Sequence, residues 1–222
     1  LILKNISDDK NIYSLFFWGL PFLLVLGFFT YVTIGYFQLI NLFLLLFGIA
    51  YFFYFRPISK DFLKSIIIPT FLFVGLLISK THEDFYLYHY QHVKELVDAP
   101  LKLGLANLEI RYSYSSIFSY IQGLFYLPYL ELKLFHVPIY LIYVSFVGYL
   151  VENINNSNNK DLKFFMSFIT ILLVIKFTRL SEFGYDYIGQ FILLFLFIEN
   201  IISKQKKNFE DDLKLIVQFV FA

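Results

Sequence analysis

The sequence predicts an all-α, polytopic integral membrane protein, and three observations lead to this fold class. Of the 222 residues, 59% are hydrophobic and 16% are charged, whereas an average soluble domain is about 45–50% apolar and about 25% charged. Residues 12–55 carry no charged side chain, which is long enough for two spans of about 20 residues each. Further apolar runs follow along the chain. A soluble domain of this size could not hide so much apolar surface in one core.

We therefore expect about six full transmembrane helices and a truncated seventh. The break between the first two is expected at TIGYFQ, residues 33–38, and the third run contains Pro69. Spanning helices tolerate such a proline because neighbouring helices can satisfy the freed carbonyl. The predicted spans cover residues 12–33, 37–55, 62–79, 136–151, 162–178 and 187–203, and the seventh begins near residue 213.

The ends of the sequence suggest a piece of a longer protein. The chain begins with Leu1 and stops within an apolar run that is roughly half as long as a membrane span. We interpret residues 1–222 as a single transmembrane domain from a longer chain.

Lysine and arginine predict the orientation. They occur in the short segments 56–64, 152–163 and 204–207 and before the first span. With six spans, all four of these segments lie on one side, which the positive-inside rule makes cytoplasmic. The N-terminus is then cytoplasmic, the protein lies in the cell (inner) membrane, and residues 80–135 form a large loop on the outer face.

Two stretches of this outer loop, residues 84–97 and 113–127, mix aromatic and polar side chains. Amphipathic aromatic helices of this kind lie well at the headgroup level. We expect two interfacial helices here and the lipid bilayer as a partner. The net charge of +1 does not favour nucleic acid as a partner.

Titratable residues gather at the start of the loop. The stretch THEDFYLYHYQHVKEL, residues 81–96, holds three of the four histidines. Asp84 is the leading candidate for a general base or a metal ligand, with Glu83 beside it. The alternative is that Asp84 only caps the following helix. His89 and His92 are three residues apart, but the H-E-x-x-H metal pattern is absent, so an amphipathic surface role is favoured over a metal role.

A second acidic cluster lies in RLSEFGYDYIGQ, residues 179–190. Glu182 and Asp186 would share a helical face. In the predicted topology Asp186 and Asp84 lie on the same outer face, where two carboxylates could activate an acceptor hydroxyl or hold a divalent cation. Arg111 and Arg179 could grip a phosphate bidentately.

Two of these stretches resemble parts of a known enzyme group. HEDFYLYHYQHVKELVDAPLKLGLANLEIRYSYSSIFSYIQGLF, residues 82–125, resembles the outer loop of bacterial polytopic proteins related to the C-type (GT-C) glycosyltransferases, which are similar to dolichyl-phosphate-mannose mannosyltransferases. RLSEFGYDYIGQFILL, residues 179–194, resembles a later stretch of the same group.

The resemblance implies a transferase of envelope polysaccharide or glycolipid assembly. Such enzymes take a sugar from a polyprenyl-phosphate donor on the non-cytoplasmic face, and a loop carboxylate serves as base or metal ligand. Asp84 or Glu83 would be catalytic, and a divalent cation, Mg²⁺ or Mn²⁺, is the only cofactor implied. The remaining candidates would contact substrate: Arg111, Arg179, Glu182, Asp186 and His89.

Two other readings stay open. One is a transporter of lipid-linked glycans, which would need polar residues at mid-membrane depth. Only Gln38, Asn41 and Thr170 qualify, which disfavours transport. The other is a non-catalytic membrane protein.

Overall fold

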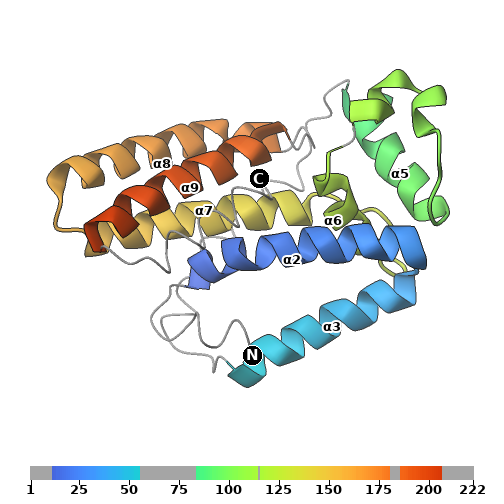
Figure 1. The fold of residues 1–222 in the computed structure, drawn as a ribbon, viewed down its shortest axis with the longest axis horizontal. Helices are drawn as coiled ribbons and strands as arrows, with labels where there is room; N and C mark the ends of the chain where they lie inside the picture. Colours follow the sequence, from blue (N-terminus) through green and yellow to red (C-terminus); the bar gives the residue numbers. More distant parts are fainter. Residues whose placement is uncertain (1–11, 56–83, 115, 181–185, 207–222) are drawn as a thin grey trace. The chain divides into compact units, whose positions relative to one another are not determined.

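The computed structural model describes residues 12–55, 84–114, 116–180 and 186–206, and Figure 1 shows their path. The described residues form helices joined by turns, with one isolated β-bridge between Leu127 and Glu131. The long helices are α2 (Ile12–Thr33), α3 (Gln38–Phe55), α7 (Val137–Asn156), α8 (Lys160–Leu180) and α9 (Asp186–Lys206). The short ones are η1 (Phe85–His89, a π-helix), α5 (Tyr90–Asp98), η2 (Leu105–Asn107), η3 (Ile110–Tyr114) and α6 (Phe118–Leu124).

The predicted number of membrane spans is wrong. Among the described residues, two helices are long and apolar enough to cross a membrane, namely Phe16–Thr33 within α2 and Val137–Asn156, which is α7. In α3 and α9 the apolar stretches are shorter, Gln38–Tyr51 and Tyr187–Ile202. About six spans and a truncated seventh are therefore not what the described helices provide.

Charged residues explain why α8 also falls short of a span. It carries Lys160, Asp161 and Lys163 at one end and Lys176 and Arg179 toward the other. The uncharged stretch between them is well below the about 20 residues that a bilayer requires. The predicted spans at 62–79 and from 213 onward lie outside the described residues.

The chain packs as two compact units. Unit 1 comprises Leu1–Phe22, Leu141–Lys176 and Tyr185–Ala222, and unit 2 comprises Leu23–Tyr140 and Phe177–Gly184.

Unit 1 is a group of helices held by aromatic packing. Phe17 stacks on Phe195 with ring centroids 4.2 Å apart, and Phe146 contacts Phe191 at 6.1 Å. The Tyr143 hydroxyl donates to the Leu173 carbonyl at 3.1 Å. The first contact joins α2 to α9, and the other two join α7 to α9 and α8. Helices α7, α8 and α9 lie side by side in Figure 1.

In unit 2, α6 docks on the end of α2 and the start of α3. The Tyr36 hydroxyl lies 2.9 Å from the carbonyl oxygens of both Gly27 and Tyr120. The Asn41 amide nitrogen donates to the Gly123 and Tyr126 carbonyls at 3.1 and 3.0 Å. Side-chain hydrogen bonds of this kind satisfy backbone groups that α6, as a short helix, leaves open. These hydrogen bonds hold α6 against α2 and α3.

Of the two predicted interfacial segments, the first is helical along its expected length and the second forms a shorter helix than expected. Residues 84–97 form η1 and α5, and residues 113–127 contain the end of η3 and then α6. Just before α6, the Ser116 hydroxyl accepts from the Phe118 amide at 3.3 Å, and Ile117 occupies the N-cap position.

Candidate functional site

The candidate site lies in the segment Asp84–Tyr114, which we call the polar layer. Its helix α5 buries one face, made of His92, Val93 and Leu96. Val93 packs with Leu132 and Phe135, and Leu96 packs with Tyr31 and Tyr36. These apolar contacts attach the polar layer to the rest of unit 2, while its charged residues stay accessible.

Asp84 and Arg111 meet at the surface of the polar layer. The Arg111 Nη1 atom lies 3.9 Å from Asp84 Oδ1, and the two side chains are 48% and 43% exposed. Arg111 Nε also lies 3.9 Å from Glu109 Oε1. The guanidinium stands over the Tyr88 ring, 5.5 Å from its centroid. The structure thus brings together two predicted site residues that the sequence separates.

This arrangement leaves the guanidinium able to take a ligand. Both carboxylates lie beyond hydrogen-bond distance of it, and exposed ion pairs contribute little to stability. A guanidinium has five N–H donors and binds phosphate bidentately. An incoming phosphate would therefore meet a positioned arginine with two carboxylates, Asp84 and Glu109, near it.

His89 and His92 lie inside the polar layer and not on its surface. They are 2% and 3% exposed. The His92 ring contacts the Tyr112 ring with centroids 5.3 Å apart. Burial, and secondarily the neighbouring His89, lowers the pKa of His92 to about 4. The preferred interpretation of these histidines as amphipathic surface is wrong, because both side chains are buried.

The remaining predicted site residues lie outside the polar layer or outside the described residues. Glu83 and Glu182 lie outside the described residues. Arg179 is in the last turn of α8, and Asp186 is the first residue of α9. Asp84 belongs to unit 2 and Asp186 to unit 1, so their pairing across a shared cation or acceptor stays a prediction. Within the described part of the chain, no three acidic, histidine or cysteine side chains gather in a way suited to a metal ion.

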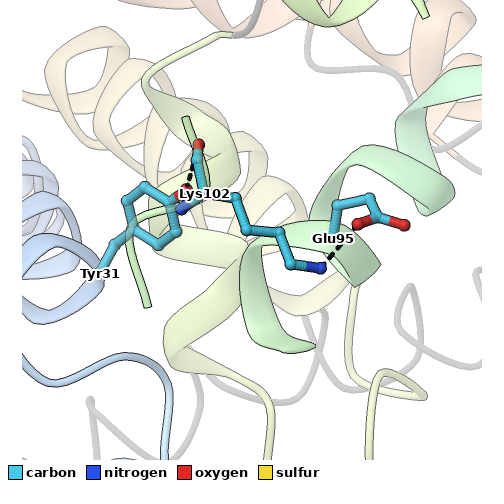
Figure 2. Close-up of polar contacts among 3 residues, drawn as sticks. All are labelled: Tyr31, Glu95 and Lys102. Atoms are coloured by element: carbon cyan, nitrogen blue, oxygen red, sulfur yellow. Dashed lines mark hydrogen bonds and ion pairs between the residues drawn. The ribbon is translucent and has the colours of Figure 1, made fainter. Parts of the chain in front are cut away.

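A tyrosine–lysine–glutamate link, which the sequence analysis missed, braces the polar layer. Figure 2 shows that the Lys102 amide donates to the Tyr31 hydroxyl at 2.8 Å, and the Lys102 ammonium contacts Glu95 Oε2 at 2.7 Å. The Tyr31 hydroxyl in turn donates to the Lys102 carbonyl at 3.2 Å. One lysine thus ties α2 to α5. No periodicity or motif marks the contact between Lys102 and Tyr31, because the two residues are 71 positions apart in the sequence.

Gln122 on α6 is a second residue that sequence reasoning missed. It is 1% exposed, and both Nε2 and Oε1 lack a hydrogen-bond partner among the described residues. Nothing in the sequence indicated this burial, since a glutamine in a predicted interfacial helix suggests a surface position. Burial of the amide shows instead that this face of α6 points inward.

Comparison with known proteins gives a family but no activity. A protein-family profile described as "Domain of unknown function (DUF8201)" matches residues 1–222. No curated protein and no solved structure matches the chain.

Proposed function

The chain belongs to the DUF8201 family, a family of domains of unknown function, and we propose that it is a membrane-embedded glycosyltransferase-like protein. In this proposal it transfers a sugar from a polyprenyl-phosphate donor to an acceptor hydroxyl on the non-cytoplasmic face. The supporting observation is the contact between Asp84 and Arg111 on the accessible surface of the polar layer.

The proposed reaction assigns one role to each of these residues. The Asp84 carboxylate takes the proton of the acceptor hydroxyl as the new glycosidic C–O bond forms. The bond between the sugar carbon and the phosphate oxygen breaks, and polyprenyl phosphate leaves. Arg111 stabilises the charge on the departing phosphate.

Lipid contact is supported by α3 in the same unit. Leu39, Phe43 and Tyr54 are 74%, 67% and 82% exposed, and α3 contains no charged residue. Extended apolar surfaces of this kind mark membrane or protein contacts. A lipid-borne substrate would approach along such a surface, beside the polar layer.

Transport is less well supported. Two of the three polar residues that a transport path would use are engaged inside the protein. Asn41 holds α6, as described above, and the Thr170 hydroxyl donates to the Met166 carbonyl at 2.8 Å.

The proposal is tested with Asp84→Asn in the complete protein. Membranes holding wild type or variant are given a panel of radiolabelled polyprenyl-phosphate hexoses and pentoses, and labelled glycolipid or glycan is counted. Loss of a general base costs about 10²–10⁴-fold, so we expect transfer to fall by at least the lower figure.

The matched control is Asp161→Asn, which removes an exposed carboxylate from α8 outside the polar layer. It should transfer as wild type does. Full transfer by Asp84→Asn would remove the catalytic role of Asp84. If wild type transfers sugar from none of these donors, the non-catalytic alternative is favoured.

A further inference from the structure

Unit 2 contains a pocket next to the C-terminal end of α5. It has a volume of about 370 Å³ and lies between the α2–α3 turn, residues 34–39, and the chain leaving α5, residues 97–100, with Tyr126 contributing. Small-molecule pockets measure about 300–1,000 Å³, and a cavity of about 150 Å³ already admits benzene. The space, which we call the turn pocket, is thus large enough for a length of alkyl chain.

The walls of the turn pocket are held in place before any ligand arrives. Gly35 has a φ of 77°, and a Cβ there would lie 3.2 Å from Pro100 Cβ. The link from Lys102 to Tyr31 and Glu95 (Figure 2) holds the chain just beyond Pro100. The Leu101 amide also donates to the Tyr31 carbonyl at 3.3 Å. A preformed site loses less conformational entropy when a ligand binds.

The described residues that line the turn pocket are mostly apolar and include one charged side chain. Ile34, Phe37 and Leu39 present aliphatic and aromatic surface, and Asp98 supplies an exposed carboxylate. Among the residues that the structure describes, no lysine, arginine or histidine lines it. The chemistry therefore suits an apolar chain whose polar end carries a positive charge, and it disfavours an anionic end.

The turn pocket is continuous with the exposed apolar surface of α3. Ile34, Phe37 and Leu39 line the pocket and are themselves 46%, 57% and 74% exposed. The same apolar surface continues along α3 through Phe43 and Phe47. A chain lying against α3 could thus enter the pocket without crossing polar surface.

We propose that the turn pocket binds one acyl chain of a bilayer phospholipid whose headgroup nitrogen is positively charged, with that nitrogen facing Asp98. The inference rests on the membrane placement in the proposed function and not on its transfer chemistry. The occupant is a lipid of the surrounding bilayer and not the sugar donor, whose phosphate belongs with Arg111.

Photolabelling of the complete protein in dodecyl maltoside micelles tests the proposal. Two probes carry the same diazirine-bearing acyl chain, one on phosphatidylethanolamine and one on phosphatidylglycerol, and labelled peptides are identified by mass spectrometry. We expect labels on residues 34–39 and 97–100. A unit charge pair near 4 Å in water corresponds to roughly fivefold in affinity, so the ethanolamine probe should label more by about that factor.

Two variants separate the chain from the headgroup. Ala99→Trp fills the pocket and should lower labelling about tenfold, because each displaced methylene changes affinity roughly fourfold. Its control is Ala106→Trp, at an exposed alanine in η2 outside the pocket, which should label as wild type does. Asp98→Asn should keep chain labelling and lose the preference between probes.

Three results would overturn the proposal. Labels outside the pocket, or labelling that Ala99→Trp leaves unchanged in a protein that still elutes as wild type, would remove the chain site. Equal labelling of wild type by both probes would remove the role of Asp98. Transfer assays on the same preparations keep the two proposals apart, since labelling without transfer contradicts only the transferase, and transfer without labelling contradicts only the pocket.

Discussion

At the scale of single residues, the burial of three histidines changes the chemistry expected of this chain most. His89, His92 and His136 are all buried. Burial lowers the pKa of His136 to about 3, as it lowers that of His92 to about 4. A charged imidazole loses its hydration on burial, so the neutral form is favoured. His92 and His136 therefore act at neutral pH as uncharged aromatic packing groups.

The lowered pKa of His92 predicts a pH-dependent stability. An unfolded histidine titrates near pH 6.5, so between about pH 6.5 and 4 the unfolded chain binds more protons than the folded one. Stability is then full above pH 6.5 and falls as the pH drops toward 4. For His92 alone the loss is on the order of 3 kcal/mol. Thermal unfolding of the complete protein across this range measures it.

His92→Phe should flatten this dependence. Phenylalanine keeps the ring contact with Tyr112 and removes the titrating group, and the His92 Nδ1 atom has no hydrogen-bond partner to lose. His136 still titrates, so part of the slope remains. An unchanged slope in His92→Phe would show that His92 does not set the acid sensitivity.

Among the elements, α6 is held by close contacts at two glycines. A Cβ at Gly27 would lie 2.7 Å from the Tyr120 carbonyl oxygen, and a Cβ at Gly123 would lie 2.5 Å from the Tyr36 ring. Tyr36 is itself buried, and burial raises its pKa. The ring cannot move aside without breaking its hydrogen bonds to Gly27 and Tyr120. Both positions require glycine, because α6 lies so close to α2 at Gly27 and to the α2–α3 turn at Gly123.

Gly123→Ala should therefore destabilise unit 2. Overpacking of a tight contact costs about 1–3 kcal/mol, and a lower thermal unfolding midpoint in detergent would reveal it. The control is Gly48→Ala in α3, where no atom lies within 4 Å of the added Cβ. Alanine is the better helix former by about 0.5–1 kcal/mol, so the control should be neutral or stabilising. Equal effects of the two changes would mean that the Tyr36 ring yields freely.

At the scale of the whole molecule, apolar surface predicts membrane association. Besides the exposed side chains of α3, Phe164, Phe168 and Ile175 on α8 are exposed. Such surfaces are unfavourable in water at about 25 cal/mol per Å². We expect the complete protein to remain in the membrane pellet after alkaline carbonate extraction, and its release into the supernatant would contradict the membrane placement.

A charge within α2 should weaken that retention. Phe22 is 60% exposed and lies in the apolar stretch Phe16–Thr33. A lysine near the centre of a spanning helix costs about 2.5–3.5 kcal/mol, so Phe22→Lys should raise the extractable fraction. Leu103→Lys, at an exposed leucine in the loop before η2, is the matched control and should leave retention unchanged.

The sequence by itself determined the local features of this protein. Composition and apolar runs indicated helices, and the break at residues 33–38 was placed where α2 ends and α3 begins. Asp84 was selected for its place in the titratable cluster at residues 81–96, and Arg111 for its guanidinium. Runs of apolar residues overstated the number of spans, because a window counts composition and does not see how soon charges such as Lys176 end a stretch.

Only the tertiary structure decided which distant residues meet. It placed Arg111 beside Asp84, buried His89 and His92, and joined Lys102 to Tyr31 and Glu95. Helical periodicity describes neighbours three and four residues apart, whereas these contacts depend on turns such as the one at Gly104, where φ is 77°. Local patterns therefore selected the candidate site residues, and the packing of α5 and α6 on the α2–α3 turn determined their surroundings.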